Sequence, residues 1–87
     1  MPTISIPPQM RDLTAGESSV RVPGKTIGEA LANLEAIHSG IRDRLCQGDD
    51  LRESIVVVVD GEESPMGMYQ PLHEDSEVHF IPMLAGG

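Results

Sequence analysis

The sequence predicts an α+β fold in which a mixed sheet of four to five strands packs on one main helix. Three features indicate this class. Short alternating runs lie near both ends of the chain, a capping motif opens an amphipathic segment at Thr26, and residues 55–59 are β-branched throughout. Because the chain has 87 residues, we expect one domain built around a single small core.

The first two strands are expected at residues 3–6 and 18–22. Polar and apolar residues alternate in both runs, and each run stops at a breaker, Pro7-Pro8 and Pro23-Gly24. The connecting loop, residues 9–17, carries the turn sequence Thr14-Ala15-Gly16, in which glycine permits a positive φ. The two strands are therefore predicted to form a hairpin.

The main helix is predicted to begin after Thr26. Thr26 as N-cap with Glu29 three residues later matches the capping box, in which each side chain binds a free backbone N–H of the first turn. Apolar residues then recur at helical spacing, and Gly40 stands where a left-handed residue would end the helix. This stripe consists of Ile27, Ala30, Leu31, Leu34 and Ile37, and Ile41 and Leu45 predict one further helical turn.

The second half of the chain predicts the rest of the sheet. Ile55–Val59 is the candidate central strand, and Asp60-Gly61 directly after it is a strong tight-turn signal. Residues 62–75 contain Pro65, Gly67 and Pro71, which exclude long regular elements, and residues 77–81 are a closing strand. If the first strand pairs parallel to the last, this element order is a β-grasp arrangement, which is the ubiquitin-like fold.

Composition and charge narrow the classes of partner. Six Lys and Arg residues against 14 Asp and Glu residues give a net charge of -8, which repels nucleic acid and anionic lipid and favours basic protein surfaces. We expect no nucleic-acid or membrane partner. Because the chain has one cysteine, no secretory leader pattern and no long apolar run, we also expect a cytoplasmic protein.

The C-terminal residues carry the candidate chemistry. After a domain of residues 1–82, the tail Met83-Leu84-Ala85-Gly86-Gly87 is expected to project freely, with a reach of roughly 17 Å if extended. Its two glycines make a slender tip that would fit a narrow channel in a partner enzyme. The carboxylate of Gly87 is ionised at neutral pH, so it can attack the α-phosphate of ATP held in such a partner.

The last eight residues, Phe80 to Gly87, resemble the closing segment of the MoaD/ThiS family of sulfur carriers. Residues 11–16, 26–31, 70–72 and 75–78 also resemble that family, and residues 34–45 are most similar to its cysteine-biosynthesis branch. The resemblance implies a cycle in which an E1-like enzyme adenylates Gly87 with ATP and a donor converts it to a thiocarboxylate. A recipient enzyme then takes the sulfur; candidates are the large subunit of molybdopterin synthase, a thiazole synthase or an enzyme of the cysteine synthase type.

The resemblance further implies that the chain is a carrier and not an enzyme, with no catalytic residue and no bound cofactor of its own. Two other functions stay open: a protein modifier joined through Gly87 to lysines of target proteins, and a ubiquitin-like scaffold. Val56, Val58, Phe80 and Pro82 are the candidate partner interface. Val56 and Val58 could instead be buried under residues 62–75.

The cysteine and the histidines are not expected to carry chemistry, and the histidines are interpreted as solvated polar residues. Cys46 has no second cysteine beside it, and an ordinary surface or half-buried thiol is the expectation. The three histidines, His38, His73 and His79, do not show the ligand spacing that nominates zinc, so no metal site is expected.

Overall fold

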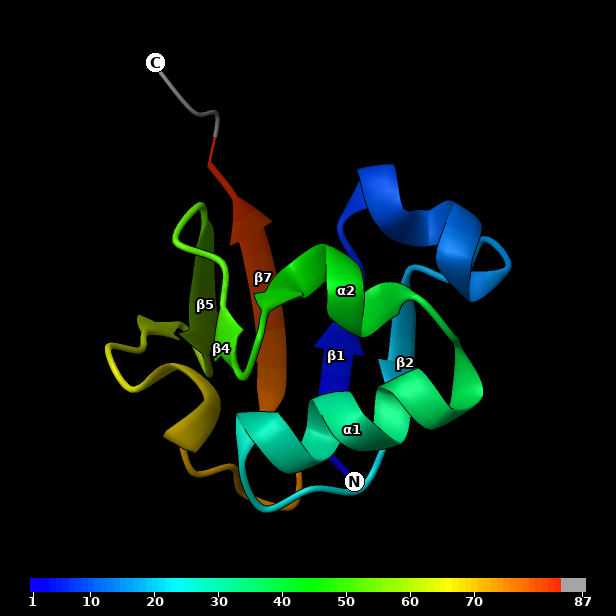
Figure 1. Ribbon diagram of the computed structural model, residues 1–87. Helices are drawn as coiled ribbons and strands as arrows, with labels where there is room; N and C mark the ends of the chain where they lie inside the picture. Colours follow the sequence, from blue (N-terminus) through cyan, green and yellow to red (C-terminus); the bar gives the residue numbers. More distant parts are fainter. Residues whose placement is uncertain (84–87) are drawn as a thin grey trace.

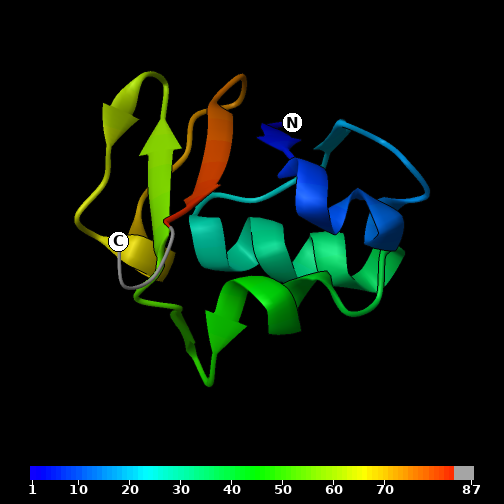
Figure 2. The ribbon, with the colours of Figure 1, turned by 90° about the horizontal axis from the view of Figure 1, so that it is seen from above.

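In the computed structural model, which describes residues 1–83, a five-stranded sheet packs against a layer of helices, as Figures 1 and 2 show from two directions. The strand order is β2-β1-β7-β5-β6, with β1 parallel to β7 and the other neighbours antiparallel. This arrangement confirms the predicted β-grasp fold. The elements are β1 (Thr3–Ser5), η1 (Pro8–Thr14), β2 (Ser19–Arg21), α1 (Ile27–Ile37), α2 (Ile41–Leu45), β3 (Cys46–Gln47), β4 (Asp50–Leu51), β5 (Ile55–Val59), β6 (Glu62–Glu63), η2 (Gly67–Tyr69) and β7 (Glu77–Pro82).

The predicted hairpin of β1 and β2 is present, with Ile4 opposite Val20. Its connection is not a simple loop, because residues 8–14 form the 3-10 helix η1. Pro8 occupies the start of that helix, where the missing N–H of proline costs nothing. The turn predicted from Thr14-Ala15-Gly16 is confirmed by positive φ angles at Ala15 (54°) and Gly16 (85°).

Helix α1 begins as predicted. The Thr26 hydroxyl accepts a hydrogen bond from the Glu29 N–H at 3.2 Å, which is the N-cap contact of the capping box. The return contact differs by one residue, since the Glu29 carboxylate accepts from the Lys25 N–H at 3.2 Å rather than from that of Thr26. Both contacts satisfy backbone donors where the chain enters the helix.

The end of α1 differs from the prediction in two details. Ile37 is 59% exposed, so the buried stripe stops at Leu34, and Ile41 of α2 continues the core instead. Gly40 has the predicted positive φ (98°), but it serves as the N-cap of α2, two residues after the C-cap of α1 at His38. Ile37 is the last residue of α1, and the chain turns after it to enter α2 at Ile41.

The prediction that Ile55–Val59 is the central strand is wrong. That strand is β5, which lies between β7 and the short edge strand β6, whereas β7 is in the middle of the sheet. Because β1 pairs with β7, the strands β1 and β2 lie on the side of β7 that is opposite to β5. The tight turn at Asp60-Gly61 is confirmed, because both residues have positive φ (52° and 86°) and join β5 to β6 as a two-residue hairpin.

The core lies between the helix layer and one face of the sheet. It contains the inward residues of the strands, the buried stripe of α1, and Ile41 and Leu45 of α2. Leucine, isoleucine and valine supply most of its volume, as the low aromatic content requires. Within the described part of the chain, no helix is both long enough and apolar enough to span a bilayer.

Candidate functional site

The candidate site starts where the chain leaves the sheet at the end of β7, at the top of Figure 1. Pro82 lies opposite Ile55, and the Met83 N–H then donates to the Ser54 carbonyl at 2.6 Å. Met83 was expected to project freely, but the pairing of β7 with the segment before β5 continues through it. The predicted sites at Leu84, Ala85, Gly86 and Gly87 lie outside the described residues and stay predictions.

One face of the sheet points away from α1 and is called the outer face here. Its central residues are cross-strand neighbours: Val56 lies opposite Ile81, while Val58 lies opposite His79, which in turn lies beside Ser5 of β1. Ile81 is 48% exposed, and Val56 and Val58 are half-buried. This face therefore presents apolar surface beside the start of the tail.

The outer face resolves the alternatives left open for Val56 and Val58. Neither side chain is fully covered, although the loop after β6 approaches one of them: Val56, Ser64 and Pro65 line the same groove of about 310 Å³. Residues 62–75 thus shield this edge of β5 only in part. Both valines lie where a partner could contact them.

Phe80 is in the core and not on this surface, which corrects its place in the predicted interface. It is 4% exposed and lies opposite the buried Val57, whereas its neighbour Ile81 points outward. The alternation within β7 already contained this information, since Glu77 and His79 are polar and Val78 is apolar. Continuing that period places Phe80 inside and Ile81 outside. Pro82 is half-buried at the end of the strand.

Cys46 is buried in the core, at 4% exposure. Burial raises the pKa of its thiol, and the nearby Arg42 and Arg52 guanidinium groups oppose this only in part. A thiol that stays protonated is a poor nucleophile, so the structure supports the interpretation of Cys46 as a structural residue. The prediction of a surface or half-buried position is corrected to a buried one.

Two carboxylates with lowered pKa values hold backbone turns together. Glu35 accepts from the N–H groups of Gly40 and Arg42, both at 2.9 Å, and these bonds lower its pKa. Asp60 accepts from the Glu77 N–H at 2.9 Å and from the Ser76 hydroxyl at 3.0 Å, which lower its pKa in the same way. Each carboxylate joins two elements, which explains the shift without a catalytic role.

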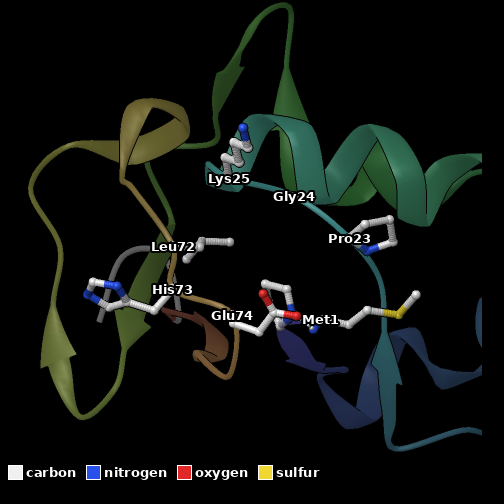
Figure 3. Close-up of a pocket in the computed structure, with 8 residues that line it drawn as sticks. Met1, Pro23, Gly24, Lys25, Leu72, His73 and Glu74 are labelled. Atoms are coloured by element: carbon white, nitrogen blue, oxygen red, sulfur yellow. Dashed lines mark ion pairs between the residues drawn. The ribbon is translucent and has the colours of Figure 1, made fainter.

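A hollow of about 270 Å³, drawn with its lining residues in Figure 3, lies at the opposite end of the sheet from Met83. Its lining includes Lys25 and His73, and the N-terminal amine of Met1 forms an ion pair with Glu74 at 3.6 Å. Because it lies beside the starts of β1 and β7, it is remote from Met83 at the end of β7. Across residues 1–83 there is also no cluster of His, Cys, Asp and Glu placed to hold a metal ion.

Comparison with known proteins identifies the relatives of this fold and tail. A model of the ThiS family matches residues 4–87. The chain belongs to the ThiS family. This match confirms the resemblance found in the sequence. It runs from Ile4 in β1 to Gly87.

Individual relatives cover nearly the whole ThiS-family chain. Sulfur carrier protein CysO of Mycobacterium tuberculosis is 32% identical over 90 residues, covering 98% of this chain and 97% of that protein. A chain in the crystal structure of the Amycolatopsis orientalis BexX/CysO complex is 32% identical, with a TM-score of 0.93 and full coverage of both chains. The crystal structure of SAMP1 from Haloferax volcanii (TM-score 0.79, 24% identity, 99% and 98% coverage) shares the fold.

Proposed function

We propose that this chain is a sulfur carrier whose reactive group is the carboxylate of Gly87. The observation that carries the proposal is the extent of the family match, which runs through Gly87 and so includes the terminal glycine pair. A relative that aligns with nearly the entire chain is named a sulfur carrier protein, which supports the same function here.

The chemistry takes place in partner enzymes. In an E1-like adenylating enzyme, a carboxylate oxygen of Gly87 attacks the α-phosphorus of ATP; pyrophosphate leaves and an acyl adenylate forms. Hydrosulfide (HS⁻) from a sulfide donor then attacks the acyl carbon, AMP leaves with its phosphate oxygen, and the chain carries a thiocarboxylate. ATP is bound by the enzyme, and no cofactor resides in the carrier.

The thiocarboxylate then gives its sulfur to a recipient enzyme. Of the three recipient types implied by the family, we place the cysteine synthase type first, because residues 34–45 resemble the cysteine-biosynthesis branch. The molybdopterin synthase large subunit and thiazole synthase are the other two.

The outer face supports a docking role in this cycle. Val56 and Val58 offer half-buried apolar surface, and Ile81 adds an exposed side chain one strand away. Together with Pro82, these residues lead directly to Met83, the last residue before the reactive segment. An enzyme that binds this face holds the base of the tail while the tip enters its active site.

The test is intact mass spectrometry of the chain after incubation with its adenylating enzyme, ATP and a sulfide source. The wild-type chain should show an oxygen-to-sulfur exchange at the C-terminus, and a variant lacking Gly87 should show none while keeping its thermal unfolding midpoint. Ile81→Ala is the matched control, because it alters docking and leaves the reactive carboxylate in place. At saturating enzyme it should be loaded fully.

Three outcomes would count against the proposal. Sulfur loading of the chain without Gly87 would refute the assignment of that residue. A glycine-linked remnant on lysines of other proteins, with no thiocarboxylate, would establish the modifier function instead. If neither the thiocarboxylate nor the lysine-linked remnant is found in cells that require sulfur, both functions are eliminated.

A further inference from the structure

A third hollow, of about 360 Å³, lies on the outer face at the end of the sheet that leads to Met83. One wall is the end of β1 and the start of η1, with Ser5, Pro7 and Arg11; the other is formed by Val58 of β5 and by His79 and Ile81 of β7. Because β1 runs parallel to β7, both walls lie near the strand ends that precede Met83. We call this hollow the Arg11 pocket.

The guanidinium of Arg11 is held in place within the pocket. Its Nε–H donates to the Ile6 carbonyl at 3.0 Å, and the side chain is half-buried. This contact uses one donor of the five, and no described residue accepts a hydrogen bond from the Nη1 or Nη2 groups. The Nε–H bond fixes the plane of the guanidinium, and the Nη1 and Nη2 groups can then donate together to a further acceptor.

The free fork of Arg11 is unexpected in so acidic a chain. The 14 Asp and Glu residues outnumber the six Lys and Arg residues, yet in the described part of the chain no arginine forms an ion pair with a carboxylate. The ion pair found there joins the N-terminal amine to Glu74. Arg11 and His79 are the titratable groups that line the Arg11 pocket, and no carboxylate lines it.

We infer that the Arg11 pocket binds a carboxylate side chain of the enzyme that activates the tail, presented between apolar residues. The fork of Arg11 matches a carboxylate in two parallel hydrogen bonds, and His79 adds a further donor. Val58, Ile81 and Pro7 form apolar walls for the flanking residues of the partner. Because the net charge of -8 repels acidic surfaces, a single Asp or Glu within a neutral or basic surface fits better than an acidic patch.

This inference rests on the proposed function for the identity of the partner, and it adds the chemistry by which the partner is recognised. Ile81 lines the pocket and is separated from Met83 by one residue. A carboxylate fixed at Arg11 would therefore set the position of the tail's base relative to the enzyme. The pocket would act as a positioning contact, remote from the reacting atoms.

The experiment measures binding of the full chain to its adenylating enzyme by isothermal titration calorimetry. Arg11→Gln removes the charge but keeps an N–H donor, and it should weaken binding about tenfold. Arg21→Gln is the matched control, since Arg21 is an exposed residue of β2 that does not line the pocket. It should change the dissociation constant by less than about threefold, as expected for an exposed charge.

Two further measurements separate a binding role from a structural one. Arg11→Lys keeps the charge and loses the fork, so it should bind more weakly than wild type while unfolding at the same temperature. At about 1 M salt the difference in binding between wild type and Arg11→Gln should persist in large part, because a half-buried charge pair is screened much less than an exposed one. If Arg11→Gln fails to fold, the Arg11→Lys variant still tests the pocket.

The outcomes distinguish this inference from the function on which it rests. Equal effects of Arg11→Gln and Arg21→Gln, or no binding of the wild-type chain to the enzyme, would overturn the inference. Weaker binding of Arg11→Gln together with full sulfur loading at saturating enzyme supports both proposals. The same weaker binding with no sulfur loading of the wild-type chain supports the pocket and refutes the carrier chemistry.

Discussion

Phe80 and Ile81 are consecutive residues of β7 with opposite environments, and exchanging each for alanine should separate stability from binding. Phe80 is 4% exposed and packs in the core, whereas Ile81 is 48% exposed on the outer face. Truncation of a buried phenylalanine costs about 3–5 kcal/mol, the sum of lost transfer free energy and the cavity left behind. Truncation of the half-exposed isoleucine should cost less than about 1 kcal/mol.

The size of the first effect is large for this chain. A domain of 87 residues has a free energy of unfolding of roughly 4–13 kcal/mol, so Phe80→Ala removes a major share of it. At about 4–8 °C for each kcal/mol, its unfolding midpoint should fall by at least about 12 °C. Ile81→Ala should melt within a few degrees of wild type and bind the adenylating enzyme more weakly.

Thermal and urea unfolding followed by circular dichroism measure the stabilities, and calorimetry measures the binding. The interpretation fails if Phe80→Ala unfolds within about 5 °C of wild type, since truncating a buried phenylalanine should lower the free energy of unfolding by more than this shift allows. It also fails if Ile81→Ala loses as much stability as Phe80→Ala, because the two faces of β7 would then be equally packed.

Two further predictions concern titratable groups. Hydrogen bonds from Glu77 and Ser76 lower the pKa of Asp60 in the folded state, so its stabilising contribution is present above the unfolded pKa of about 3.9 and is lost as pH falls through the folded value. The difference in unfolding midpoint between wild type and Asp60→Asn should therefore shrink from pH 7 to pH 2, with the exposed Asp75→Asn as control; a constant difference would contradict this. Because Cys46 is buried with a raised pKa, iodoacetamide should alkylate it much more slowly in the native chain than in urea. The exposed neighbouring position, tested as Gln47→Cys in a Cys46→Ala background, should react fast, and equal native rates at positions 46 and 47 would disprove the burial argument.

Local signals in the sequence predicted the parts of the fold that depend on neighbouring residues. The N-cap at Thr26, the turn at Asp60-Gly61 and the hairpin of β1 and β2 are each encoded within a few residues, and each is present. The prediction that residues 55–59 form the central strand was wrong, because the order of strands in a sheet depends on pairing between distant segments. The parallel contact of Ile4 with Val78 joins residues from the two ends of the chain.

The same distinction applies to the candidate site. The glycine pair is visible in the sequence as a motif, and its family assignment follows from the match to residues 4–87. The Arg11 pocket is not visible there, because η1 has no strong helical pattern and because Arg11 comes to line one hollow with residues of β5 and β7 only in the folded chain. Phe80 is an intermediate case, since strand periodicity alone would have placed it correctly.

The hydrogen bond from Met83 to Ser54 sets a limit on the architecture of any enzyme that acts on this chain. It anchors Met83, and four residues follow Met83 in the sequence, so Gly87 can lie no farther than about 14 Å from that anchor. An enzyme that modifies Gly87 must therefore hold its reactive centre within that depth below the surface that meets β7. An enzyme with a deeper centre would have to break the anchoring bond, at a cost of about 1 kcal/mol, to gain one more residue of reach.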